Sequence, residues 1–401
     1  MNSIKKATGH YISGQEKLNM LSYGIAGFIM SARTSAFSSI QEEFYLNYSS
    51  ISLLVLVSGI IMQISTFLSG YSLRRYRHRL NIALSLFIFG TSFVLIYLSA
   101  GYWMVFSSFC IMLFGFGAVV LSLNMYTGFL AGKNPGPALM RLHLGYSLGA
   151  LLGPKAISFF ITSGMNWRFI YIPSACIVFI ISFLYFYLPE KKNEVENGEA
   201  GTVKNIYPET KPVDVKMVKK AVLIFVVIFI AGQLWEYGFG TWFVIFSKQH
   251  FSLTEITSST YLTLFWLCFP ISRISAGYIV RKTGAVSLLA ISFLSIFLCV
   301  ATGFVFSIPL FFSITGLFTA LLYPLTMTLM QQTLGSHRSD LIGIISMTGG
   351  FINYLLISST GTIADIFGIA IGFGSISFYM LAGALASVSL GMLMSVKKSG
   401  T

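Results

Sequence analysis

Long apolar runs follow one another along almost the whole sequence, with short polar loops between them. Charged residues make up only 10% of the chain, against roughly 25% in an average soluble protein. A water-soluble core cannot hold this much apolar surface, so we expect an all-α membrane protein. Runs of about 20 apolar residues suit a membrane-spanning helix, and twelve can be counted, at roughly 18–40, 50–73, 82–100, 103–129, 141–163, 168–188, 220–246, 256–279, 286–306, 308–331, 342–364 and 369–395.

One long polar interval divides these runs into two groups of six. Residues 189–219 mix acidic and basic side chains and include Pro208 and Pro212. Such a segment cannot bury enough apolar area to fold alone, and it is typical of a solvated linker. We therefore divide the chain into an N-terminal six-helix half (1–188), a linker (189–219) and a C-terminal six-helix half (220–401).

The loops on the two sides of the predicted membrane differ sharply in charge. Of the 26 Lys and Arg residues, 21 lie in the linker, the termini and the loops of one side, and only Arg168 and Lys248 lie in the loops of the other. Positive residues collect on the cytoplasmic side. We therefore expect both termini and the linker to be cytoplasmic. We also expect the membrane to be a bacterial cytoplasmic (inner) membrane, and the chain to act as a monomer in this lipid bilayer. The net charge of +13 is spread over short loops, which argues against nucleic acid as a partner.

A basic motif occurs twice, between the second and third spans of each half. Gly70–Leu80 begins Gly-Tyr-Ser-Leu-Arg-Arg, and Gly277–Ala285 begins Gly-Tyr-Ile-Val-Arg-Lys. Two six-span halves with such a repeat suggest a carrier with parallel internal repeats. At this point the chain resembles the major facilitator superfamily, whose signature in this loop is Gly-x-Leu-Ala-Asp-Arg-x-Gly-Arg-Lys.

The resemblance implies two pseudo-symmetric six-helix halves that move a small-molecule substrate by alternating access. Arg74 and Arg281 stand where the family carries the Asp of a cytoplasmic charge network. The chain therefore departs from the usual form of that network at both positions. We expect a gating role for four basic residues at this end of the spans: Arg74, Arg75, Arg273 and Arg281.

A narrower resemblance connects the chain to the fucose permease-like sugar:proton symporters. Its motifs are His143 with Gly145-x-x-x-Gly149-x-x-x-Gly153-Pro154, Glu236-Tyr-Gly-x-Gly-x-Trp242, Gly316–Pro324 and Gly361–Gly368. Asn124 also matches, but Val120 occupies the position at which that family carries an acidic residue. The resemblance implies a sugar-like substrate, and this departure weakens a direct transfer of the proton-coupling scheme.

Charged residues inside spans are costly and usually mark a pathway, and four occur here: Arg33, Lys155, Glu236 and Arg273. At about 1.5 Å per residue, the first three fall roughly 4–6 Å beyond the midplane toward the outer side, so we expect them to form one site. Arg33 either binds an anionic or hydroxyl-rich substrate or forms an ion pair with Glu236. Lys155 points either into the cavity or toward lipid, and the cost of a charge in lipid favours the cavity.

Glu236 is the only carboxylate deep in a predicted span. A proton-linked carrier needs a carboxyl group that gains and loses its proton as access alternates, which makes Glu236 the candidate for proton coupling; the alternative is a partner for Arg33 or Lys155. Pockets generally add a few polar groups to apolar walls. We expect substrate contacts from Asn124, Gln233, Tyr237, Trp242 and Asn353, with Gln63 and Trp266 as further candidates. His143 is either a packing residue or a proton relay.

No enzyme motif is present. The sequence lacks a glycine-rich phosphate loop and a Cys/His cluster, and its four cysteines all fall inside apolar runs, so we expect no cofactor and no metal. Two functions compete. Family likeness favours a proton-linked carrier of a sugar-like solute, and the excess of deep cations favours an organic anion, imported or exported, held by Arg33, Lys155 and Arg273. A non-transporting receptor on this fold is a third possibility, and we would expect it to carry an added soluble domain.

Overall fold

Helices account for nearly all of the described chain, because a segment that crosses a bilayer must satisfy its backbone hydrogen bonds internally. The computed structural model describes residues 14–73, 75–132, 136–187, 215–334 and 339–399. Twelve long helices occur in this part of the chain, and the prediction of an all-α membrane fold is confirmed. Arg74 and most of the predicted linker, residues 189–214, lie outside the described residues.

The helices match the predicted runs one to one, with bounds that differ by a few residues. The first half contains α1 (Gly14–Glu43), α2 (Tyr48–Ser72), α3 (His78–Tyr97), α4 (Tyr102–Ala131), α5 (Gly136–Thr162), the short 3-10 helix η1 (Trp167–Ile170) and α6 (Tyr171–Tyr187). The second half contains α8 (Val215–His250), α9 (Glu255–Thr283), α10 (Ala285–Val305), α11 (Leu310–Leu334), α12 (Ser339–Phe367) and α13 (Ile369–Ser399). Helix α8 therefore begins inside the predicted linker, at Val215, and Lys219 in its early part is exposed.

Eleven of these helices are long and apolar enough to cross a membrane by length and composition. The exception is α1, which carries many serines as well as Arg33 in its central part. Most of its central residues are buried against other helices. The central part of α1 is therefore surrounded by protein, whereas the other helices also contact lipid. That position explains why a helix of low hydropathy can occupy the middle of the bundle.

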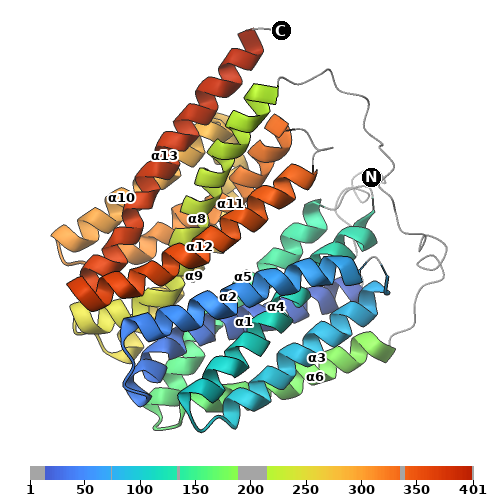
Figure 1. Ribbon diagram of the computed structural model, residues 1–401, viewed down its shortest axis with the longest axis vertical. Coiled ribbons are helices and arrows are strands. Elements are labelled where there is room, and N and C mark those ends of the chain that lie inside the picture. The colour runs from blue at the N-terminus through green and yellow to red at the C-terminus, as the bar shows by residue number, and fades with distance from the viewer. Residues whose placement is uncertain (1–13, 74, 133–135, 188–214, 335–338, 400–401) are drawn as a thin grey trace, which may run out of the picture.

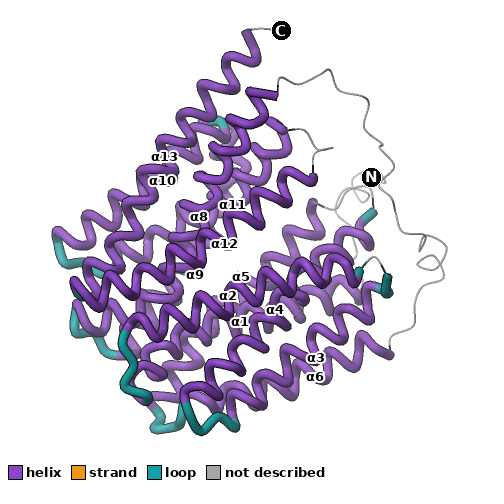
Figure 2. Tube along the Cα trace, viewed as in Figure 1, coloured by secondary structure: helices purple, strands orange, loops and turns teal. Residues whose placement is uncertain are grey.

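The helices form two groups that lie side by side (Figure 1). Helix α1 packs on α5, α3 packs on α4 and α6, and α8 and α10 both pack on α13. The halves meet through α2 with α12, α5 with α9, and α1 with α8. Figure 2 shows helices joined by short loops at both ends, with no strand in the part that is drawn in colour.

The two ends of the bundle differ. We call the end at which α1 begins and α13 ends the near face, and the opposite end the far face. The two groups of helices converge toward the far face and spread apart toward the near face (Figure 1). The cross-half hydrogen bonds and ion pairs reported below lie either at the far face or in the middle layer, by which we mean the central part of the long helices. This distribution is expected for a structure that is closed at the far face.

Glycines bring α1 and α5 into direct backbone contact. A Cβ atom added to Gly149 would collide with the carbonyl oxygen of Gly24, and one added to Gly145 would lie 2.6 Å from the carbonyl oxygen of Met20. Small residues allow this close approach between helices in membranes. The two helices therefore form one tightly packed unit at the centre of the first half.

We predict that Gly149→Ala destabilises the protein by about 1–3 kcal/mol, because the added methyl group forces the α1 and α5 backbones apart. Thermal unfolding of the purified protein in detergent would show a lower melting temperature. Gly128→Ala in α4 is the matched control, since nothing lies within 4 Å of the added atom, and alanine is favoured over glycine in a helix. Equal melting temperatures for the two variants would contradict the close contact.

Candidate functional site

Glu236 lies near the middle of α8 and is partly exposed. Its charge interacts with that of Arg273 on α9. Four tyrosines are also within electrostatic range of this carboxylate: Tyr23, Tyr146, Tyr237 and Tyr323. Because Tyr23 and Tyr146 belong to the other half, Glu236 is within electrostatic range of residues from both halves.

Tyrosines from both halves gather around this position. The tyrosine cluster comprises Tyr23 of α1, Tyr146 of α5, Tyr237 of α8, Tyr323 of α11 and Tyr354 of α12. The rings of Tyr23 and Tyr146 lie 5.0 Å apart, and those of Tyr237 and Tyr354 stack at 6.2 Å. The cluster therefore offers flat ring faces and hydroxyl groups beside the Glu236 carboxylate.

Arg33 lies in α1 with 8% of its surface exposed. Its guanidinium carbon is 5.3 Å from the centre of the Phe37 ring, and its Nε atom has no hydrogen-bond partner. Three members of the cluster, Tyr146, Tyr237 and Tyr354, are within its electrostatic range. No salt bridge joins Arg33 to Glu236 among the described residues, so the ion-pair alternative has no support in this conformation.

The other two cations in the spans have separate partners. Lys155 is exposed, and its Nζ atom donates a hydrogen bond to Thr260 on α9 of the other half. Arg273 donates from Nη1 to Ser147 of α5, also across the halves, at 2.9 Å. Arg273 thus lies within electrostatic range of Glu236 without a salt bridge between these two described residues, and Lys155 lies at the seam between α5 and α9.

Asn124 and His143 interact within the first half. The Asn124 amide donates to the carbonyl oxygen of Val120 at 2.7 Å, and its Oδ1 atom lies 3.1 Å from His143 Nε2. The His143 ring also meets Tyr23 edge-on at 5.4 Å. An amide does not titrate, so these contacts favour packing over proton relay for His143.

Several other predicted contacts are buried polar groups without partners. Both amide atoms of Asn353 are buried and unbonded, and the residue is only 1% exposed. The indole Nε1 atoms of Trp242 and Trp266 are also unpartnered. A buried polar group without a hydrogen bond is costly, so these atoms are suited to a polar ligand or to water. Gln233 is buried in α8, and Gln63 lies against Gly350 of α12.

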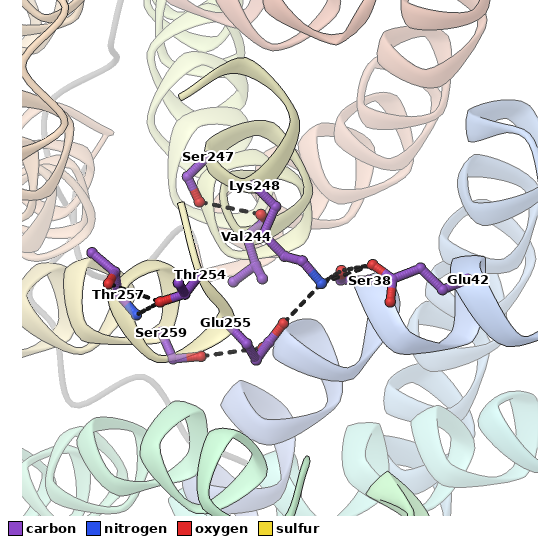
Figure 3. A network of polar contacts seen from close by, with 9 residues as sticks. All are labelled: Ser38, Glu42, Val244, Ser247, Lys248, Thr254, Glu255, Thr257 and Ser259. Carbon is purple, nitrogen blue, oxygen red and sulfur yellow. Dashed lines mark hydrogen bonds and ion pairs between the residues drawn. The ribbon is translucent and has the colours of Figure 1, made fainter. Parts of the chain in front are cut away.

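At the far face, a polar network joins the halves (Figure 3). Lys248 at the end of α8 donates to Glu42 of α1 at 2.7 Å and to Ser38 of α1 at 2.9 Å. The same ammonium group lies 3.1 Å from Glu255 at the start of α9. Lys248 therefore holds one carboxylate from each half.

A second cross-half contact joins α12 to α2. The carboxylate of Asp365 accepts hydrogen bonds from the backbone amides of Tyr48 and Ser49, each at 2.9 Å, and from the Ser49 hydroxyl. The Tyr48 hydroxyl donates to Gln249 of α8. By contrast, Arg168 is paired within its own half, with Glu43 at 2.7 Å.

The repeated basic motif forms the same contact twice at the near face. The Arg75 guanidinium lies 4.8 Å from the centre of the Tyr71 ring, and Lys282 Nζ lies 4.6 Å from that of Tyr278. Each tyrosine follows the motif glycine, and each cation lies four residues further on. Arg281, a predicted gating residue, donates to the carbonyl oxygen of Gly277 in its own helix at 3.1 Å.

Sequence reasoning missed most of the tyrosine cluster and the carboxylates at the far face. The sequence predicts only Tyr237 of this cluster as a site residue, because its 20 tyrosines give no pattern that separates site from surface. The far-face residues had a usable signal. Arg168 and Lys248 are the two predicted outer cations, and acidic residues stand at the ends of the neighbouring spans, among them Glu42, Glu43 and Asp365.

Comparison with protein families gives one match. The model of the Major Facilitator Superfamily matches residues 20–355. The chain belongs to this superfamily and is a secondary transporter of the membrane, not an enzyme. Comparison with curated proteins finds no match.

Solved structures share the fold at low sequence identity. A mutant of the nucleoside transporter NupG has a TM-score of 0.75 at 14% identity, covering 93% of this chain and 98% of that one. A D-xylose-proton symporter also has a TM-score of 0.75, at 16% identity and coverages of 94% and 96%. An inward-facing, unoccupied bacterial homologue of the human lysosomal transporter Spinster scores 0.70 at 11% identity, with coverages of 96% and 98%.

We predict that Arg33→Ala lowers substrate affinity by at least about tenfold, because a hydrogen bond to a charged group contributes about 1.5–3 kcal/mol. The measurement is the ligand-induced thermal shift, titrated with a solute that stabilises the wild-type protein. Lys219→Ala, an exposed cation at the start of α8, is the control and leaves the affinity unchanged. Wild-type affinity in the Arg33 variant would remove Arg33 from the site.

Proposed function

We propose that this transporter is a proton-linked carrier of a neutral, sugar-like solute, with its near face toward the cytoplasm. The observation that carries the proposal is the tyrosine cluster around Glu236, built from both halves. A site shared by the halves is what alternating access requires, since each half must contact the solute as access changes.

The chemistry of the site suits a ring that bears hydroxyl groups. The cluster supplies aromatic faces and phenol hydroxyls, and Arg33 and Asn353 supply buried polar atoms that lack partners. The opposite charges of Glu236 and Arg273 offset one another, and Lys155 is engaged with Thr260 at the seam. The centre therefore has less positive charge to offer an anion than the residue count suggested.

Two of the structural neighbours are named for compatible substrates, a nucleoside and D-xylose. Both contain a pentose ring. The fucose permease-like motifs, including Glu236-Tyr-Gly-x-Gly-x-Trp242, support the same substrate class. These likenesses are consistent with the proposal, whose main support is the arrangement of the cluster.

Glu236 is the proposed proton-coupling group. It faces Arg273 from α9, Tyr23 from α1, Tyr146 from α5 and Tyr323 from α11. Its access depends on which end of the carrier is open, because it lies between the halves. A carboxyl group in this position can take up a proton on one side of the membrane and release it on the other.

An organic anion is the second candidate substrate, and one observation favours it. Arg33 has no carboxylate partner among the described residues, so a carboxylate on the solute would complete its hydrogen bonds. A thermal-shift screen of the purified protein separates the two. We expect stabilisation by neutral sugars or nucleosides; stabilisation by sugar acids or other carboxylates alone would overturn the proposed substrate class.

We predict that Glu236→Gln abolishes accumulation driven by a pH gradient, because the amide cannot carry a proton across the membrane. Exchange of labelled for unlabelled solute at equal concentrations should continue, since it needs no net proton movement. Both are measured in proteoliposomes, with Glu43→Gln as a control that removes a carboxylate at the far face. Accumulation by Glu236→Gln that still responds to the pH gradient would rule out the coupling role.

A further inference from the structure

Two adjacent carboxylates at the end of α1 hold different halves of the molecule. Glu43 accepts from Arg168 at 2.7 Å and from the Trp167 indole at 2.8 Å, both in its own half. Glu42 accepts from Lys248 of the other half at 2.7 Å. Glu42 therefore forms a contact between the halves, and the next residue, Glu43, forms a contact within one half.

Glu42 and Asp365 lie at positions where their own helices disfavour an acidic side chain. The C-terminal end of a helix carries partial negative charge, so anionic side chains there are unfavourable. Glu42 lies one residue before the end of α1, and Asp365 lies two residues before the end of α12. Their positions are explained by the partners that the opposite half supplies.

Asp365 lies against the N-terminal end of α2. The first amides of a helix lack partners within it, and Asn47 satisfies the amide of Ser50. Asp365 satisfies the two amides that precede the Ser50 amide, those of Tyr48 and Ser49. The end of α2 is thus capped from within and from the other half, and the second cap exists only while the far face is closed.

We propose that Glu42 with Lys248, and Asp365 with the first turn of α2, form a lock that holds the far face closed and sets the resting conformation of the carrier. The lock rests on alternating access and deepens the proposed function, but it does not depend on the identity of the solute. The pairs cross between the halves, so the far face cannot open until they separate.

Lys248 also has a partner that makes the lock reversible. Glu255 lies 3.1 Å from Lys248 and belongs to the same half. When Glu42 moves away with α1, Lys248 keeps Glu255 and is not left as an unpaired cation at the membrane surface. Opening therefore removes one ion pair and retains the other.

The test measures the conformation directly, in the full-length carrier in lipid nanodiscs without solute. The four native cysteines are replaced by serine, and spin labels are attached at Trp103 and Phe306. These far-face positions belong to opposite halves, are 69% and 66% exposed, and take no part in the lock. Electron–electron distance measurements give the fraction of molecules with an open far face.

We predict that Glu42→Gln and Asp365→Asn each increase the far-face-open fraction, and that the double variant increases it roughly three- to tenfold, as loss of exposed, charge-assisted contacts allows. A second label pair at Met140 and Met392, on the near face, should show the complementary closure. Complementary changes distinguish a switch of conformation from partial unfolding, which broadens both distributions.

The matched control is Glu43→Gln, which breaks a far-face ion pair of similar length within one half. It should leave both distance distributions unchanged. The lock is overturned if the Glu42 and Asp365 variants behave like this control, or if all three shift alike. Because no solute is present, a failure of the proposed substrate or proton coupling would leave this result intact.

Discussion

An ionised side chain inside a bilayer is expensive, by about 2.5–3.5 kcal/mol at a helix centre on insertion scales, and this cost governs where the few charges of the chain lie. Arg273 and Glu236 interact within the second half, and Arg273 also reaches Ser147 of the first. Arg168 and Lys248, at the far face, both have carboxylate partners. Arg33 has no carboxylate partner among the described residues, and its Nε atom, like that of Arg273, has no hydrogen bond.

The contrast between the two layers defines the state of the molecule. In the far-face layer, Lys248 and Asp365 are each bonded to groups of the other half. The middle layer contains unpartnered polar atoms on Arg33, Asn353, Trp242 and Trp266. A carrier that is closed at one end and has an unsatisfied centre is arranged to receive a solute from the other end.

The sequence alone predicted the fold well, because the cost of exposed backbone in lipid leaves few alternatives to twelve apolar helices. The polar interval before α8 and the repeated Gly-Tyr motif are the basis of the proposed division into two halves. The contacts of Tyr71 with Arg75 and of Tyr278 with Lys282 follow that repeat. The candidate site was less accessible. The depth of a residue along a helix can be counted from its number, and this count predicts Glu236 and Arg33 as site residues. The rotation of a helix about its axis and the tilt between the halves cannot be counted in this way. The sequence therefore predicts neither the position of Lys155 at the seam beside Thr260 nor the part that Tyr23 and Tyr354 have in the cluster.

The glycine contact between α1 and α5 has a mechanical consequence. Backbones that touch at Gly24, Gly145 and Gly149 cannot bend independently, so α1 behaves as a stiff lever supported along its length by α5. Arg33 and Glu42 lie nine residues apart on that lever, or about 13 Å at the helical rise. A tilt that draws Glu42 away from Lys248 must therefore carry Arg33 with it in the same direction by a smaller amount. The site and the far-face end of α1 are two points on one rigid arm, and neither can change position without the other.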